Sequence, residues 1–265
     1  MKIGMPFLLE LTSPEEAAAL CRELGLDFVE LNLNFPACQL EALDVQELYR
    51  LRRQYGVGFT LHLEEECDPL AFNPAVRRAW LESIRRTLIL AQALECPVVN
   101  MHWPRGIYIT LPTEKVFLYE RYADDYRAAV EAFADVCRAE LQGSGVRLAI
   151  ENTNGFTAWE KDTLRDLMQE PCFGLTLDIG HSHAVQDVDL PFFREQEGKL
   201  IHMHVHDAQG TRNHLPLDEG ESPWRERLHW ACEKGASAVL ETKTVAALRH
   251  SVGILKREGL MNEKC

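Results

Sequence analysis

The sequence predicts a single (β/α)8 barrel, and three observations lead to this expectation. The chain has 265 residues, and a barrel of this class typically has about 250. Short apolar runs alternate with amphipathic stretches eight times along the chain. No G-x-G-x-x-G follows the first apolar run, which disfavours the doubly wound open sheet, the structural rival. We therefore expect one domain over residues 1–265, with a parallel barrel covered by helices.

The strands are expected in eight runs that are nearly continuous in apolar residues, because a parallel strand is buried on both faces. In chain order these runs are 2–8, 28–34, 58–64, 97–103, 146–152, 174–179, 200–207 and 238–243. Helices are expected between them at 14–24, 44–55, 74–94, 119–142, 163–169, 190–195, 223–233 and 245–258. Ser13-Pro14 is a good helix start, and Gly25 and Gly56 are good stops.

The two longest connections, 104–118 and 208–222, follow the fourth and seventh predicted strands. Barrel enzymes build their sites from the loops that follow strands, so these connections mark the expected functional end. No linker, low-complexity tract or internal repeat beyond the alternation itself interrupts the chain.

The composition is that of an ordinary soluble enzyme, with 46% hydrophobic and 26% charged residues. The chain has no apolar run of about 18 residues and no signal-peptide pattern, so we expect no membrane association. Its eight cysteines form no C-x-x-C pair, and we expect reduced thiols in a cytoplasmic protein. The net charge of −13 makes a nucleic-acid partner unlikely.

Side chains that bind metals recur at the carboxyl ends of the third to eighth predicted strands. They are His62, His102, Glu151, Asp178 with His181, His204 and Glu241, and the loop after the seventh strand adds His214. Alternate strand residues share a face, so His202, His204 and His206 point into the barrel while their apolar neighbours point outward. Imidazoles and carboxylates buried together are costly unless a cation joins them. The set predicts a divalent metal, Zn or Mn first and Mg or Co next.

A more ordinary interpretation competes at every single position. One histidine at the end of a strand is more often a hydrogen-bonded structural residue than a ligand. We expect His183, His202 and His206 to be such core or supporting residues, and His229 and His250 to lie on helix surfaces. The metal hypothesis depends on six consecutive strands each offering a ligand at the same end.

With these motifs the chain resembles the xylose isomerase-like TIM barrels, which include sugar isomerases and epimerases and the endonuclease IV class of apurinic/apyrimidinic endonucleases. The resemblance begins at the segment 24–31 and continues through Ile150-Glu151-Asn152-Thr153 and Leu177-Asp178-Ile179-Gly180-His181. Its strongest part is His204-Val205-His206-Asp207 with the segment 213–221, and it ends at Leu240-Glu241-Thr242-Lys243.

For the epimerases, the resemblance implies one metal bound by Glu151, Asp178, His204 and Glu241. Glu151 and Glu241 would also be acid/base groups on opposite faces of the sugar, with His181 assisting at hydroxyl protons. For the endonucleases, it implies a zinc cluster that adds His62, His102, His181 and His214. That cluster uses an aspartate two residues before the loop histidine, where this chain has Arg212. A third metal is therefore not implied, and Arg212 becomes a candidate contact for a substrate phosphate.

The leading hypothesis is a metal-dependent isomerase or epimerase of a small sugar or sugar phosphate, working through an enediolate. The alternatives are an endonuclease IV-like phosphodiester hydrolase, another metal-dependent lyase, dehydratase or hydrolase, and a non-enzymatic binding module. Four acids in the segment 63–68 disfavour DNA, because DNA affinity depends on Lys and Arg near the phosphates. The particular sugar and the oligomeric state are left open.

Overall fold

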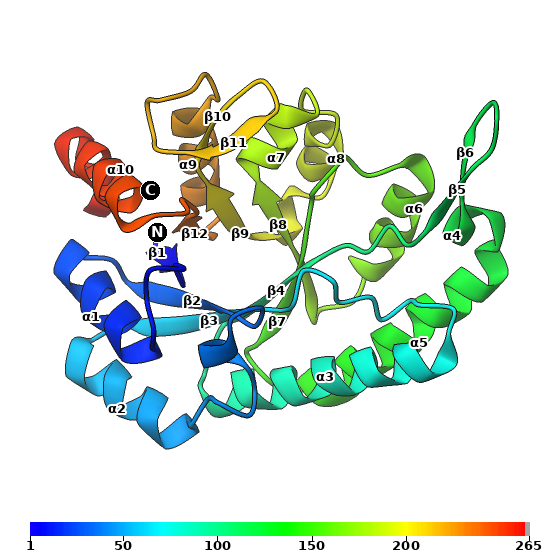
Figure 1. The fold of residues 1–265 in the computed structure, drawn as a ribbon, viewed down its shortest axis with the longest axis horizontal. Helices are drawn as coiled ribbons and strands as arrows, with labels where there is room; N and C mark the ends of the chain where they lie inside the picture. The colour runs from blue at the N-terminus through cyan, green and yellow to red at the C-terminus, as the bar shows by residue number, and fades with distance from the viewer. Residues whose placement is uncertain (263–265) are drawn as a thin grey trace.

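The computed structural model describes residues 1–262 and confirms a closed barrel of eight parallel strands (Figure 1). Around the barrel the strands follow the order β1-β12-β9-β8-β7-β4-β3-β2. Their bounds are Ile3–Pro6 (β1), Phe28–Asn32 (β2), Gly58–His62 (β3), Val98–His102 (β4), Arg147–Glu151 (β7), Phe173–Asp178 (β8), Leu200–Val205 (β9) and Ser237–Leu240 (β12). All eight lie within one residue of, or inside, the predicted runs.

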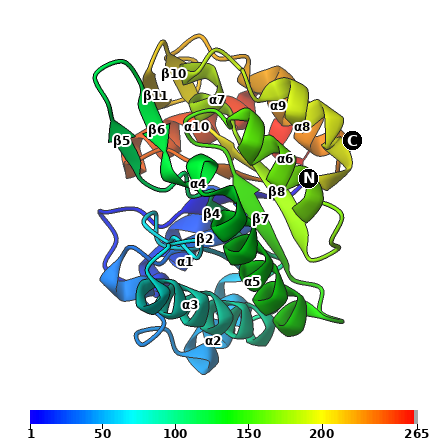
Figure 2. The same ribbon diagram turned by 90° about the vertical axis from the view of Figure 1, so that its right-hand side faces the viewer.

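Helices cover the outside of the barrel, as expected (Figures 1 and 2). The longer ones are Pro14–Leu24 (α1), Val45–Tyr55 (α2), Pro74–Ala93 (α3), Ala123–Leu141 (α5), Ala158–Leu167 (α6), Trp224–Glu233 (α9) and Val245–Glu258 (α10). Short helices are Leu118–Arg121 (α4), Ile179–Ala184 (α7) and Leu190–Glu195 (α8), with 3-10 turns at Pro36–Cys38 (η1), Glu197–Lys199 (η2) and Leu260–Asn262 (η3). Helix α1 starts as predicted, because the Ser13 side chain accepts from the Glu16 amide, and it stops at Gly25, whose φ is 77°.

The predicted start of the fifth expected helix, at residue 163, is wrong by five residues. Thr157 and Glu160 form a capping box, in which each side chain bonds the backbone of the other, so α6 begins at Ala158. The two long connections also contain hairpins that the sequence did not predict: Tyr108–Thr110 (β5) with Lys115–Phe117 (β6), and Asp207–Gln209 (β10) with Arg212–Leu215 (β11). The β5–β6 hairpin projects from the barrel in both ribbon views.

The inside of the barrel is divided into an apolar plug and a polar layer above it. At the amino ends of the strands the Phe28 ring occupies the space beside Gly4, where a Cβ atom would come within 2.5 Å of the ring. Above this ring lie five buried polar side chains, those of Glu30, Thr60, Asn100, Thr176 and His202. A barrel interior is usually filled by branched apolar residues, so this layer calls for a separate explanation.

Among residues 1–262, six cysteines are buried free thiols, in agreement with the prediction. In the described part of the chain, no helix has both the length and the apolar character needed to cross a membrane.

Candidate metal centre

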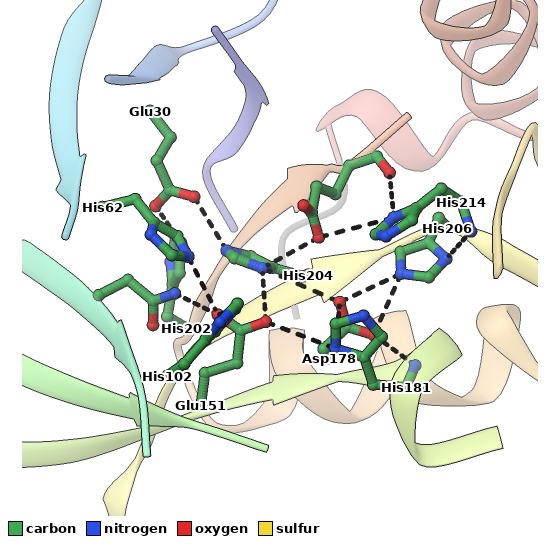
Figure 3. A network of polar contacts seen from close by, with 12 residues as sticks. Glu30, His62, His102, Glu151, Asp178, His181, His202, His204, His206 and His214 are labelled. Atoms are coloured by element: carbon green, nitrogen blue, oxygen red, sulfur yellow. Dashed lines mark hydrogen bonds and ion pairs between the residues drawn. The ribbon is translucent and has the colours of Figure 1, made fainter. Parts of the chain in front are cut away.

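His204 lies at the centre of a cluster of carboxylates at the carboxyl end of the barrel (Figure 3). Its Nδ1 atom is 3.2 Å from Oε1 of Glu151 and 3.2 Å from Oε2 of Glu241. The same atom is 4.0 Å from Oδ2 of Asp178. One ligand atom from each of these four residues lies within 4.8 Å of the other three, a compact arrangement for a single cation.

The strand register explains why these residues meet. Asp178 on β8 pairs directly with His204 on β9, so their side chains leave the sheet at the same level. Glu151 is the last residue of β7, and Glu241 follows β12, with its amide donating to the Val205 carbonyl at 3.0 Å. The inward direction predicted for His202, His204 and His206 is confirmed, because all three contact carboxylates inside the barrel. The outward direction expected for Ile201 is wrong, because a register shift in β9 turns it against Val98 and Ala149, which share the inward face of Asn100 and Glu151.

The charges in this cluster depend on one another. Burial favours the neutral form of Glu151 and Glu241, yet the adjacent positive His204 lowers the pKa of each well below its usual value. Burial acts in the opposite direction on His204, but Glu151, Glu30 and Glu241 raise its pKa well above the ordinary value. Oε2 of Glu241 is buried, and its closest contact is the ion pair with Nδ1 of His204 at 3.2 Å, which lacks the geometry of a hydrogen bond. Three carboxylates and one imidazole gathered about one point fit a divalent cation.

The other oxygen of Glu151 faces a pair of histidines. Its Oε2 is 3.4 Å from Nε2 of His62 and 3.6 Å from Nε2 of His102, and the amide of Asn100 donates to it. The two rings meet edge to face with centroids 5.1 Å apart. Glu151 therefore faces two groups, with Oε1 towards His204 and Oε2 towards the pair. Among the described residues, His62, Glu151 and His204 each place one ligand atom within 4.8 Å of the others, a second candidate position for a cation.

A third group of histidines surrounds Asp178, and its members differ in their freedom to bind. Nε2 of His206 lies 3.1 Å from both oxygens of Asp178, while its Nδ1 accepts from the His214 amide at 2.8 Å. Both nitrogens are thus occupied, and His206 holds Asp178 in place, the supporting role expected for it. Nδ1 of His181 lies 3.7 Å from Oδ2 of Asp178.

His214 remains a neutral imidazole close to the carboxylate cluster. Its Nδ1 is 4.0 Å from Oε2 of Glu241, and its ring packs on that of His206 at 4.3 Å between centroids. Burial lowers the pKa of His214 to about 4, although Glu241 opposes the shift. A neutral imidazole is the form that binds a metal, so His214 stays available to the site.

The remaining histidines and Arg212 lie outside the cluster. His183 contacts Glu221 at 3.3 Å, His229 contacts Glu233 at 3.4 Å on the exposed face of α9, and His250 is exposed on α10, as expected for the last two. Arg212 is exposed on β11.

Two charged residues that touch the cluster were not among the predicted site residues. Lys243 places Nζ 2.7 Å from Oε1 of Glu241, and in the sequence it only closes the motif that contains Glu241. Glu30 is buried on β2 with Oε1 2.9 Å from Nε2 of His204. The sequence could have identified Glu30, because side chains alternate between the two faces of a strand. With Val29 and Leu31 facing outward, the carboxylate of Glu30 must point into the barrel.

Comparison with known proteins agrees with this architecture. The family profile described as xylose isomerase-like TIM barrel matches residues 18–258. A D-tagatose 3-epimerase-like protein aligns over 100% of this chain and 99% of its own, with 23% identity and a TM-score of 0.76. The 3-keto-D-glucoside 4-epimerase from E. coli aligns over 97% of this chain and 99% of its own, with 15% identity and a TM-score of 0.77. A Thermus thermophilus protein soaked with ZnCl2 aligns over 99% of this chain and 100% of its own, with 22% identity and a TM-score of 0.69. No curated protein sequence matches the chain.

Proposed function

The chain belongs to the xylose isomerase-like TIM barrel family, and we propose that it is a metal-dependent isomerase or epimerase of a small sugar or sugar phosphate. The observation that carries the proposal is the placement of two glutamates about one point. Glu151 and Glu241 come from β7 and from the end of β12, and each directs an oxygen to within 3.2 Å of the same atom of His204. A substrate bound there would have a carboxylate on either side.

A bound divalent cation would polarise the carbonyl and the adjacent hydroxyl of a sugar and so acidify the carbon-bound proton between them. One glutamate would remove that proton, leaving the substrate as an enediolate. The other would return a proton to the opposite face, which inverts the configuration at that carbon. Because Glu151 and Glu241 both have lowered pKa values, each is ionised near neutral pH and able to accept a proton.

Nearby groups suit the accessory steps of such a reaction. His181, partly buried with Nδ1 4.0 Å from Oε1 of Glu151, would exchange the hydroxyl protons of the substrate. Lys243, paired with Glu241 and more than half exposed, adds a positive charge beside the reacting position. Arg212 is exposed on the β10–β11 hairpin, whose other strand follows β9, and would reach a substrate phosphate if the sugar carries one. We propose Zn²⁺ or Mn²⁺ as the cation, and a sugar or sugar phosphate as the substrate.

A second function is favoured by one observation, the histidine pair beside Oε2 of Glu151. With a cation held by His62, His102 and Glu151, the centre would have two metals, the arrangement used for in-line hydrolysis of phosphodiesters. Glu151 would then have both oxygens engaged and could not act as a base.

The loop after β3 disfavours DNA as the substrate of such a hydrolase. Glu65 and Glu66 are exposed there, and Asp68 is held in place by the Tyr119 hydroxyl at 2.6 Å. These acids lie where a DNA backbone would need cations. Because the acidic loop disfavours DNA binding, we propose the isomerase or epimerase ahead of the hydrolase.

The two functions are separated by one pair of assays on metal-loaded protein. Incubation in D2O with a panel of ketoses and sugar phosphates should introduce deuterium at one carbon of the true substrate and give its epimer or isomer. Nicking of an abasic duplex, abolished by EDTA, without exchange into any sugar would reverse the order of the two proposals.

A further inference from the structure

The polar layer beneath the metal centre contains a buried carboxylate with three partners. Oε2 of Glu30 accepts from the Thr60 hydroxyl at 3.1 Å and lies 3.1 Å from Nε2 of His202. Oε1 of Glu30 lies 2.9 Å from Nε2 of His204. The side chain of Glu30 is 3% exposed, so its charge is balanced by these partners rather than by water. Figure 3 shows Glu30 on the side of His204 opposite to Asp178.

The chain of contacts continues below Glu30. Nδ1 of His202 lies 2.6 Å from the Ser237 hydroxyl, so both nitrogens of His202 have a partner. The ring of His202 is fully buried and lies 6.0 Å from that of Phe28. Serine, histidine and glutamate thus form one connected line that runs up the inside of the barrel and ends on His204.

From this line we infer that Glu30 is a positioning residue, which orients His204 so that Nδ1 and not Nε2 faces the cation. An imidazole that binds a metal through one nitrogen commonly donates its other N–H to a carboxylate, which fixes the tautomer and strengthens the ligand. His204 has the placement that this arrangement needs, with Nδ1 beside Glu151 and Glu241 and Nε2 2.9 Å from Oε1 of Glu30. In the metal-free chain the contact with Glu30 is an ion pair whose angle is not that of a hydrogen bond. His202 and Thr60 keep Glu30 in position. The inference rests on the proposed metal centre and extends it to residues outside the ligand set.

The positioning role of Glu30 explains why polar side chains fill this layer of the barrel. Burying a carboxylate and an imidazole in a barrel core costs stability relative to apolar packing of the same volume. Asn100 in the same layer donates to Glu151, another residue of the candidate ligand set. Four members of the layer therefore support the ligands from beneath, in place of apolar packing: Glu30, Thr60, Asn100 and His202.

The test measures metal affinity, independently of any substrate. Glu30→Gln keeps the size of the side chain and removes its charge, and it should weaken metal binding by about 10- to 100-fold, the usual effect of losing such a partner. The dissociation constant is obtained from metal-free protein by competition with a chromophoric chelator. Thr176→Val is the matched control, because Thr176 lies in the same layer and its hydroxyl has no partner in the described chain. This control should change the affinity by less than about twofold.

A second measurement uses the unaltered chain and does not depend on how the variants fold. In protein loaded with 113Cd and labelled with 15N, the metal should couple to Nδ1 of His204, with a proton retained on Nε2. Coupling to Nε2 would overturn the inference, as would a folded Glu30→Gln variant that binds metal as tightly as the control. If the unaltered chain binds no cation, the proposed function itself fails. If it binds one and Glu30→Gln makes no difference, only this inference fails.

Discussion

Replacing Gly180 by alanine tests whether His206 holds Asp178 in place. Gly180 lies in α7 directly against the His206 ring, and a Cβ atom there would be 1.9 Å from Cε1 and 2.4 Å from Nδ1. Non-bonded carbon atoms approach to about 3.5 Å, so the ring would have to move by roughly 1.6 Å. A shift of that size breaks the 3.1 Å contact with Asp178 and the 2.8 Å bond from the His214 amide.

The expected cost follows from these contacts. Two buried hydrogen bonds contribute about 1 kcal/mol each, and overpacking adds about 1–3 kcal/mol. Gly180→Ala should therefore lower the free energy of unfolding by roughly 3–5 kcal/mol in urea titrations of metal-free protein. Metal affinity should fall by about tenfold or more, because Asp178 loses the partner that orients it. Gly198→Ala is the control, since a Cβ atom there meets nothing within 4 Å. Equal stability and metal affinity in the two variants would refute the role assigned to His206.

Three further predictions concern the metals and the substrate class. His62→Ala should lower the number of cations per chain from two to one in elemental analysis if the histidine pair binds a second ion, and an unchanged count would remove that pair from the centre. His204 has a raised pKa in metal-free protein, despite burial, so it is protonated near pH 7 and a cation must displace its proton. Metal affinity should accordingly rise with pH until His204 is neutral, and calorimetry in buffers of different ionisation enthalpy should detect proton release; binding without release would contradict the shift. The acidic loop that includes Glu65 and Glu66 predicts no useful affinity for an abasic duplex at physiological salt, and tight binding in a mobility-shift assay would show that the loop does not repel DNA.

The strands could be predicted because their signal is local. Met203 and Val205 alternate with three histidines, and that alternation indicates which of these side chains enter the barrel. It fails only at Ile201, where a register shift in β9 breaks the alternation. The convergence of His204 with Glu151 and Glu241 follows once eight parallel strands are placed in a closed barrel. The start of α6 is also readable from Thr157 and Glu160, whose spacing is that of a capping box, although the apolar pattern points to a later start.

Other features depend on contacts that no local pattern reveals. The partner of Glu30 is His204, 174 positions later in the chain, and only the closure of the barrel brings the two together. The backbone of His214 has a φ of 56°, a conformation that the sequence of the hairpin does not specify. His62 and His102 face the same oxygen of Glu151 because of the register between β3, β4 and β7. This register cannot be read from the sequence and is known only from the structure.

If Glu151 and Glu241 transfer protons at a metal centre, replacing either by Gln should lower turnover even when the variant keeps its cation. The change preserves size and removes the ability to act as a base, although an amide is also a weaker ligand, so cation content must be measured in the same samples. With metal retained, Glu241→Gln and Glu151→Gln should each lower turnover of the true substrate by about 10²- to 10⁴-fold, the usual contribution of a general acid or base. Near-normal turnover in both fully loaded variants would show that the two carboxylates only hold the cation, and the mechanism would be wrong.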